Sequence, residues 1–243
     1  MIAFLTSSPC IYGAPRAIVN PENGFADNLR RCLPDRIRCL FIASSPDEPH
    51  LTQRFGYEMA SCFAEAGFLF SDFQILDRQN QKDAQMLIWK SDFIILAGGH
   101  VPTQNAFFQD IGLRELLKGY QGVVLGISAG TMNAADRVYV QPEEPGESVP
   151  EFPRFAEGLG ITKINVLPHY QMVKDNYLDG RRLFEDITYA DSMGNCFFAL
   201  PDNSFIYQDE DHQLLFGEGY CLRSGILEKI CENDQVYDLQ ELE

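Results

Sequence analysis

The chain has 243 residues, 45% of them hydrophobic, which is enough for one sizeable core. Its 35 acidic and 19 basic residues give a net charge of −16, and no basic stripe is visible along the sequence, so nucleic acid is not an expected partner. No apolar run reaches membrane-spanning length, and the first nine residues lack the charged start of a signal peptide, so we expect no membrane association. The seven cysteines form no C-x-x-C pair, which fits a reducing cytoplasm and a protein without a metal or cofactor.

The first two-thirds of the chain alternate short apolar runs with amphipathic segments. We expect strands at 2–5, 37–43, 68–76, 92–97 and 121–125, and helices at 25–33, 48–66, 81–90 and 104–118. The runs at 37–43 and 92–97 are apolar along most of their length, as in strands covered on both faces. The pattern predicts a single α/β domain over residues 1–243, with a doubly wound, mostly parallel sheet and helices on both faces.

The last third of the chain has a different composition. Residues 141–155 begin with an acidic, proline-rich run, and we expect them to form a mobile surface loop. A strand at 164–167 and a helix at 178–189 are expected next. Short apolar runs at 196–200, 204–207 and 213–216, separated by turn sequences, predict a small antiparallel C-terminal extension over residues 196–243.

The stretch Gly126-Ile-Ser-Ala-Gly130 follows the strand expected at 121–125 and precedes a segment that can be helical. A strand, a G-x-S-x-G turn and a helix form a nucleophile elbow, whose sharp turn favours glycine on both sides of the serine. Ser128 would then stand at a helix N-terminus, where free N–H groups favour negative charge. The pattern makes Ser128 the candidate nucleophile, although the same pentapeptide also arises by chance.

A second strand end carries groups suited to assist this serine. Ligands of doubly wound sheets bind beyond the carboxyl ends of the strands, and Gly98-Gly-His100 follows the strand expected at 92–97. The backbone N–H of Gly99 can pair with that of Ala129 as an oxyanion hole, while Gly98 and His100 are candidate substrate contacts. The alternative for the paired glycines is an ordinary turn between a strand and a helix.

A serine hydroxyl needs a base, and the chain has four histidines. His50 and His212 fall in acidic segments typical of the surface, whereas His169 follows a strand end and is the preferred base. Its alternative role is that of a packed strand-end histidine. Asp202, in a Leu-Pro-Asp-Asn turn, competes with Glu143 or Glu144, in the acidic loop, for the role of orienting the imidazole, and the sequence does not decide between them.

Together these residues resemble the aspartyl dipeptidase (peptidase E) and cyanophycinase family of serine peptidases, which has the class I glutamine amidotransferase-like fold. The resemblance spans roughly residues 37–207 and rests on Leu96-Ala-Gly-Gly99, Gly126-Ile-Ser-Ala-Gly130, Leu167-Pro-His-Tyr170 and Leu200-Pro-Asp-Asn203, in the family's order. It implies Ser128 as nucleophile and His169 as base, places the acid at Asp202 or near Glu143, and implies a substrate contact by Gln104.

The sequence departs from the family where an acidic substrate would be bound. Aspartyl dipeptidases carry an arginine-rich helix start after the histidine, and here Arg181 and Arg182 stand in that stretch. They would either grip a substrate carboxylate or lie on the surface of a helix. The segment from His100 to Gln104 also lacks the family's asparagine-containing turn, so specificity for an N-terminal aspartate does not follow.

We therefore expect a cytoplasmic serine peptidase, monomeric or homodimeric, that hydrolyses small peptides without a cofactor. One alternative is an amidotransferase-like relative, which would need a cysteine thiolate where Ser128 stands. Another is a non-catalytic protein that keeps the fold and the pocket. A lipase-like hydrolase is not supported, because the HGGG-type oxyanion loop and a late C-terminal histidine strand are missing.

Overall fold

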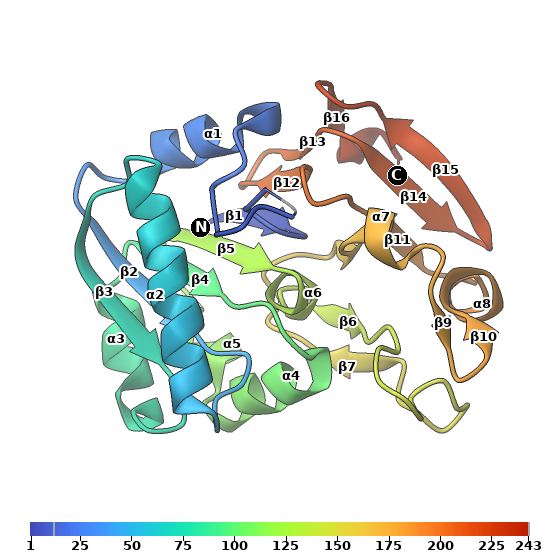
Figure 1. Cartoon of the computed structure of the whole chain (residues 1–243), viewed down its shortest axis with the longest axis horizontal. Helices are drawn as coiled ribbons and strands as arrows, with labels where there is room; N and C mark the ends of the chain where they lie inside the picture. The colour runs from blue at the N-terminus through green and yellow to red at the C-terminus, as the bar shows by residue number, and fades with distance from the viewer. Residues whose placement is uncertain (12, 243) are drawn as a thin grey trace.

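A computed structural model describes residues 1–11 and 13–242, which are built around an eight-stranded central sheet (Figure 1). Five strands are parallel and lie in the order β3, β2, β4, β5, β1; three antiparallel strands, β12, β13 and β16, continue the sheet beyond β1. Their bounds are β1 (Ile2–Thr6), β2 (Ile37–Ile42), β3 (Phe70–Leu76), β4 (Phe93–Leu96), β5 (Val123–Ile127), β12 (Phe205–Gln208), β13 (Gln213–Phe216) and β16 (Val236–Asp238).

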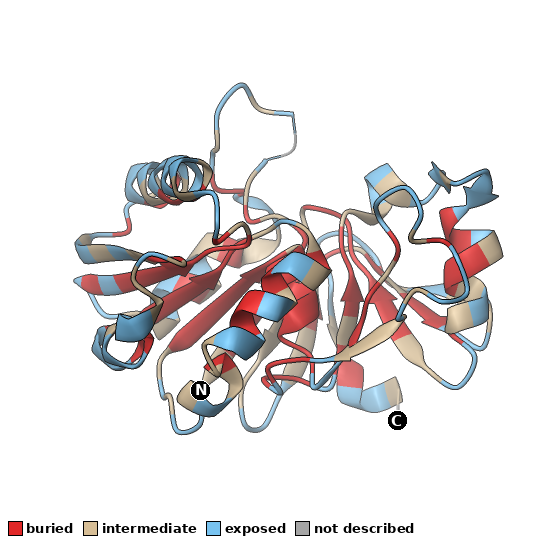
Figure 2. Ribbon diagram, turned by 90° about the horizontal axis from the view of Figure 1, so that it is seen from below, coloured by how far each residue is buried: buried red, intermediate tan, exposed pale blue. Residues whose placement is uncertain are grey.

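Helices cover both faces of this sheet, as the continuous apolar strands predict. One face packs against α1 (Phe25–Cys32) and α2 (Pro49–Glu65), and the other against α3 (Ala84–Lys90), α4 (Val101–Asp110) and α5 (Leu113–Leu116). Neighbouring residues of one strand enter opposite cores: Phe41 joins the α1 and α2 side, while Leu40 and Ile42 join the other. Figure 2 shows the strands as a buried band between helices whose outer faces are exposed.

A second, four-stranded sheet lies beside the central one, drawn in orange and red in Figure 1. Its order is β15 (Ile226–Cys231), β14 (Gly219–Arg223), β11 (Cys196–Ala199) and β8 (Asn165–Leu167), with β8 parallel to β11. The strands after residue 196 are thus antiparallel where they pair with one another, but they do not form one separate extension. β12, β13 and β16 belong to the central sheet, whereas β11, β14 and β15 belong to the second sheet.

The expected helix at 178–189 is replaced in its first part by a small hairpin. Strands β9 (Tyr177–Leu178) and β10 (Arg181–Arg182) pair antiparallel through Asp179 and Gly180, both of which have positive φ. An Asp-Gly pair readily adopts the left-handed angles that such a tight turn requires. Helical structure begins only afterwards, in the π-helical segment η3 (Leu183–Thr188) and in α8 (Tyr189–Asp191).

Smaller elements complete the description. The helix expected at 104–118 begins earlier and divides into α4 and α5 at Gly112, whose φ is +63°. The acidic loop is enclosed by the antiparallel strands β6 (Arg137–Tyr139) and β7 (Phe155–Glu157), which the sequence did not suggest. Three 3₁₀ turns occur in the described chain: η1 (Glu22–Gly24), η2 (Gln81–Asp83) and η4 (Leu239–Leu242). None of the described helices combines the length and apolar character needed to cross a membrane.

Candidate active site

Ser128 stands in a sharp turn between β5 and the short helix α6 (Ala129–Asn133). Its φ of 49° and ψ of −112° lie outside the regions that non-glycine residues normally occupy. The Ser128 N–H donates to the Thr6 carbonyl at 3.0 Å, which fixes the turn to the end of β1. Such backbone strain costs of order 1–3 kcal/mol and concentrates at functional sites. The strand, the sharp turn at Ser128 and the following helix have the geometry expected of the elbow.

The two glycines of the elbow are required by close backbone contacts. A Cβ on Gly126 would lie 2.7 Å from the Cα of Thr131, and one on Gly130 would lie 2.3 Å from the carbonyl oxygen of Leu96. Because both obstacles are backbone atoms, they cannot move aside as a flexible side chain would. The helix can therefore turn back tightly against β4 and β5, and the turn lifts Ser128 to the edge of the sheet.

His169 and Asp202 meet because the strands before them are parallel neighbours. Leu167 of β8 is paired with Ala199 of β11, so the segments that follow leave the second sheet at the same edge. His169 Nδ1 lies 2.5 Å from Asp202 Oδ1, and the aspartate side chain is only 7% exposed. A carboxylate can only accept, so Nδ1 carries the hydrogen and Nε2 is left as the basic nitrogen.

Gln171, on the helix α7 (Tyr170–Val173), completes the surroundings of this aspartate. Its Nε2 donates to Asp202 Oδ2 at 2.7 Å, and its Oε1 accepts from the Asp202 N–H at 3.2 Å. With both carboxylate oxygens bound, Asp202 can adopt few other orientations, and the imidazole of His169 is held in turn. Gln171 is a positioning residue that no motif in the sequence pointed to.

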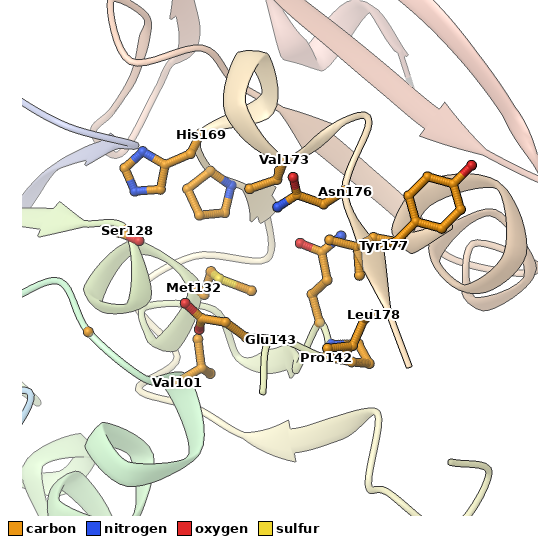
Figure 3. Close-up of a pocket in the computed structure, with 14 residues that line it drawn as sticks. Val101, Ser128, Met132, Pro142, Glu143, His169, Val173, Asn176, Tyr177 and Leu178 are labelled. Carbon is orange, nitrogen blue, oxygen red and sulfur yellow. The ribbon is translucent and has the colours of Figure 1, made fainter. Parts of the chain in front are cut away.

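Ser128 and His169 face the same cavity of about 170 Å³ (Figure 3). Their side chains make no direct hydrogen bond in the described part of the chain, and such bonds often tighten only when substrate binds. Apart from Gly99, Ser128 and His169, the lining comes from short segments around the site: Val101, Met132, Gln141, Pro142, Glu143, Pro168, Val173, Asn176, Tyr177, Leu178 and Leu183.

The backbone around Gly99 fits the predicted oxyanion hole. Gly99 lines the cavity, and neither its N–H nor that of Ala129 donates to an acceptor within the described residues. A Cβ on Gly98 would lie 3.4 Å from the Cβ of Ser128, so the glycine pair lies directly beside the serine. Ser44 Oγ donates to the Gly98 carbonyl at 2.6 Å and would lie 2.5 Å from a Cβ on Gly99. The hydrogen bond holds the Gly98–Gly99 loop in place, and the closeness of Ser44 leaves room only for glycine at position 99.

Gln104 does not reach the cavity, which corrects the expectation that it contacts substrate. The side chain is fully buried, its Nε2 donates to the Ala97 carbonyl at 2.7 Å, and its Oε1 accepts from Asn133 Nδ2 at 3.1 Å. Because every polar atom of the amide is engaged within the core, Gln104 supports the Gly98–Gly99 loop from behind.

Arg181 and Arg182 are also engaged elsewhere, and neither lines the cavity. Arg181 donates to the carbonyls of Ser148 at 3.1 Å and Asp186 at 2.7 Å. Arg182 forms an ion pair with Asp186 at 2.7 Å, and this side chain and its backbone N–H lower the pKa of Asp186 to about 2. The expectation of an arginine grip for substrate is corrected: both arginines stabilise the β9–β10 hairpin.

Glu143 lies at the cavity and not beside the Nδ1 atom of His169. Figure 3 shows its side chain among the lining residues, across from His169. The residue is exposed as a whole, but loss of water around its carboxyl raises the pKa; the nearby His100 and His169 oppose this shift in part. Of the two acids proposed from the sequence, Asp202 is the one that the structure brings to the imidazole.

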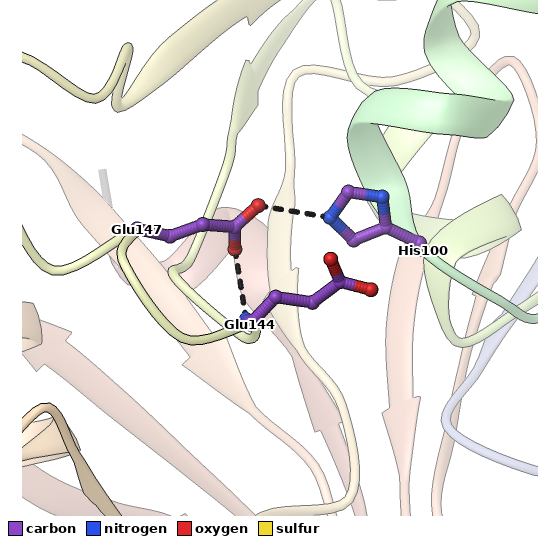
Figure 4. A group of neighbouring side chains, drawn as sticks. All are labelled: His100, Glu144 and Glu147. Atoms are coloured by element: carbon purple, nitrogen blue, oxygen red, sulfur yellow. Dashed lines mark hydrogen bonds and ion pairs between the residues drawn. The ribbon is translucent and has the colours of Figure 1, made fainter.

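His100 ties the acidic loop to the protein and is not among the residues that line the cavity (Figure 4). Its Nε2 lies 3.0 Å from Glu147 Oε1, and its Nδ1 lies 2.8 Å from Thr103 Oγ1. The expectation of a substrate contact is corrected, because both ring nitrogens already have partners. Within the described chain, His100, Glu144 and Glu147 form the group that could hold a metal ion, with possible ligand atoms within 4.8 Å of one another.

The acidic loop of residues 141–155, which was expected to be mobile, is held by several further hydrogen bonds. Glu147 Oε2 accepts from the N–H groups of Glu143 at 2.8 Å and Glu144 at 3.0 Å. Burial opposes ionisation of Glu147, but these N–H groups and His100 outweigh it and lower the pKa. At the far side of the loop, Ser148 Oγ donates to Asp179 Oδ2 at 2.7 Å. The loop is thereby joined to both the Gly98–His100 segment and the β9–β10 hairpin.

Comparison with known proteins gives the class of protein, a peptidase. The model of Peptidase family S51 matches residues 27–215, which is most of the chain, and the chain therefore belongs to this family. The family predicted from the four motifs is thus confirmed. No curated protein matches the chain at a significant level.

Solved structures show the same fold. A peptidase from an acI-B1 Actinobacterium superposes with a TM-score of 0.65 at 14% identity, covering 98% of this chain and 96% of that one. A protein from Listeria monocytogenes EGD-e, described as a candidate peptidase E, gives a TM-score of 0.61 at 14% identity, covering 95% and 98%. These likenesses confirm the predicted class I glutamine amidotransferase-like fold.

Proposed function

We propose that the protein is a serine peptidase that hydrolyses small peptides, with Ser128 as nucleophile, His169 as general base and Asp202 as the acid that orients it. The single observation that carries this proposal is the 2.5 Å contact between His169 Nδ1 and Asp202 Oδ1, at the cavity that the elbow serine also lines. It supplies what a serine at a sharp turn lacks by itself, a base with a fixed proton arrangement.

The mechanism follows from the positions of these groups. The Ser128 hydroxyl attacks the scissile carbonyl while His169 Nε2 takes its proton, and Asp202 stabilises the imidazolium that forms. The N–H groups of Gly99 and Ala129 stabilise the oxyanion, which raises the rate because these donors are fixed before the charge develops. His169 then gives the proton to the leaving amine, and water releases the acyl group by the same steps in reverse order.

The cavity supports a small substrate. Its volume of about 170 Å³ is that of several water molecules and suits one side chain rather than a folded segment. We also propose a cytoplasmic location, which the sequence supports because its seven cysteines form no C-x-x-C pair.

The test is to replace Ser128→Ala and to compare it with Ser71→Ala, an exposed serine on β3. Loss of the nucleophile should reduce dipeptide turnover at least about 10⁴-fold, and the turnover that remains would come from the other groups of the site. The Tm should not change. A fluorophosphonate probe should label the wild type and Ser71→Ala but not Ser128→Ala.

Three outcomes would contradict the proposal. Turnover by Ser128→Ala at the wild-type rate would remove the serine from the mechanism. Absence of both turnover and labelling in the folded wild type would favour a non-catalytic protein. Release of ammonia from glutamine, without peptide hydrolysis, would favour the amidotransferase-like alternative.

A further inference from the structure

The cavity beside Ser128 is apolar along most of its wall. Val101, Met132, Val173, Leu178 and Leu183 contribute aliphatic or thioether side chains from five different elements. Figure 3 shows Met132 and Val173 close to the Ser128 and His169 end of the cavity. A substrate side chain that packs against these five residues would lose its water and gain no strong hydrogen bond from them.

The charge in the cavity is negative. Glu143 is the carboxylate among the lining residues, and no lysine or arginine lines the cavity within the described chain. The nearby Arg181 and Arg182 are bound to Ser148 and Asp186. An acidic substrate side chain would therefore be desolvated without a cation to pair with and would be repelled by Glu143.

We propose that this cavity selects small peptides whose first residue is apolar, with that side chain against the aliphatic wall and the free α-ammonium group paired with Glu143. The inference rests on the proposed function and names the substrate class of the same site. It gives the exposed Glu143 carboxylate a partner of opposite charge in the cavity that Ser128 also lines. The specificity is thus the opposite of that expected for an enzyme that removes N-terminal aspartate.

Binding is measured first, so that the substrate class is tested without turnover. Calorimetric titration of the Ser128→Ala protein with Leu-Ala, Asp-Ala and N-acetyl-Leu-Ala compares the three ligands at one site. Leu-Ala should bind at least about 100-fold more tightly than Asp-Ala, because the acid loses apolar contact and stays unpaired. Acetylation of the amino group should weaken binding about two- to fivefold through loss of the Glu143 pair.

Two variants then move the charge of the cavity. Glu143→Gln should abolish the difference between free and acetylated Leu-Ala while retaining the preference for leucine over aspartate. Asn176→Arg adds a cation at an exposed lining position and should improve binding of Asp-Ala about two- to fivefold. Met172→Arg is the matched control, because Met172 is exposed nearby but does not line the cavity.

Each result decides for or against the substrate class. Tighter binding of Asp-Ala than Leu-Ala, equal binding of the two, or no binding of any dipeptide overturns it, and so does an unchanged effect of acetylation in Glu143→Gln. Preferential binding of Leu-Ala together with absence of turnover by the wild type would support the pocket assignment and contradict the proposed peptidase chemistry. The two proposals can therefore fail separately.

Discussion

The strand ends and the cavity wall are built in different ways. At the strand ends, Ser128 is bonded to Thr6, and Thr6 also exchanges two hydrogen bonds with Thr131, at 2.8 and 3.0 Å, inside the buried core. The part of the cavity wall at the β9–β10 hairpin is built from two strands of two residues each, and Tyr177 on β9 is 70% exposed. Its ties are polar contacts near solvent, such as that of Ser148 with Asp179.

In the proposed function, this difference separates the chemistry, at the strand ends, from the selectivity, at the cavity wall. Groups on packed strands keep a fixed geometry, whereas loop segments can change composition at little cost to the core. We therefore expect substitutions at the strand ends to lower kcat, and substitutions in the wall to act on KM or on local stability. Three variants, taken from the largest expected effect to the smallest, test this separation.

Asp202→Asn should lower kcat about 10⁴-fold, because an amide can turn its N–H₂ toward His169 and stabilise the wrong tautomer. The fold should be retained, since the amide has the same size as the carboxyl. Steady-state kinetics with a good dipeptide substrate and thermal melts would measure both effects.

The chain offers a matched control in Asp209, which also bonds a histidine, His212, at 3.1 Å but does not line the cavity. Asp209→Asn should leave kcat unchanged. A loss of less than about tenfold in Asp202→Asn would show that the imidazole does not depend on this carboxylate for its orientation.

Leu178→Ala should raise KM for an apolar substrate about three- to tenfold and change kcat less than twofold, because it removes part of the apolar contact used in binding. Met172→Ala, at an exposed position outside the cavity, should change neither constant. A fall in kcat of Leu178→Ala as large as that of Asp202→Asn would contradict the expectation that the wall acts on binding and the strand ends on chemistry.

Glu147→Gln should lower Tm by about 2–4 °C at pH 7, because a charged acceptor of three hydrogen bonds becomes neutral. The folded pKa of Glu147 lies below its ordinary value of 4.5, so its ionised form stabilises the folded state. That contribution is complete above the unfolded pKa and is lost as the pH falls through the folded value.

The Tm difference between wild type and Glu147→Gln should therefore shrink as the pH is lowered below about 4.5. Glu144→Gln is the control, because the Glu144 carboxyl has no hydrogen-bond partner among the described residues. A difference that stays constant between neutral and acidic pH would remove the carboxylate charge as its cause.

The sequence predicted the strand ends well because local constraints act there. A glycine on each side of Ser128 is required by backbone contacts, and the apolar run before it has few alternatives to a buried strand. His169 and Asp202 each follow a short strand and a Leu-Pro pair, so both could be located at strand ends. Their meeting depends on the parallel pairing of β8 with β11, which no local pattern specifies.

The sequence predicted poorly which side chains reach the cavity, because contacts between distant segments determine their positions. Gln104 looked suited to bind substrate, but burial against Asn133 engages its amide. Arg181 and Arg182 lie on a hairpin whose turn signal, Asp179-Gly180, was outweighed by the expectation of a helix. Choosing between Asp202 and Glu143 required the three-dimensional distance to His169, which the spacing of residues does not contain.

Ser128 and His169 share one further property, positive φ angles of 49° and 56° in residues that carry a Cβ. Glycine would adopt either angle without strain, whereas serine and histidine each lose of order 1–2 kcal/mol of stability there. Glycine at either position would therefore relieve strain but remove a side chain that the proposed mechanism requires. The protein instead retains a hydroxyl and an imidazole at two positions where the backbone disfavours a Cβ, and this choice lowers its stability.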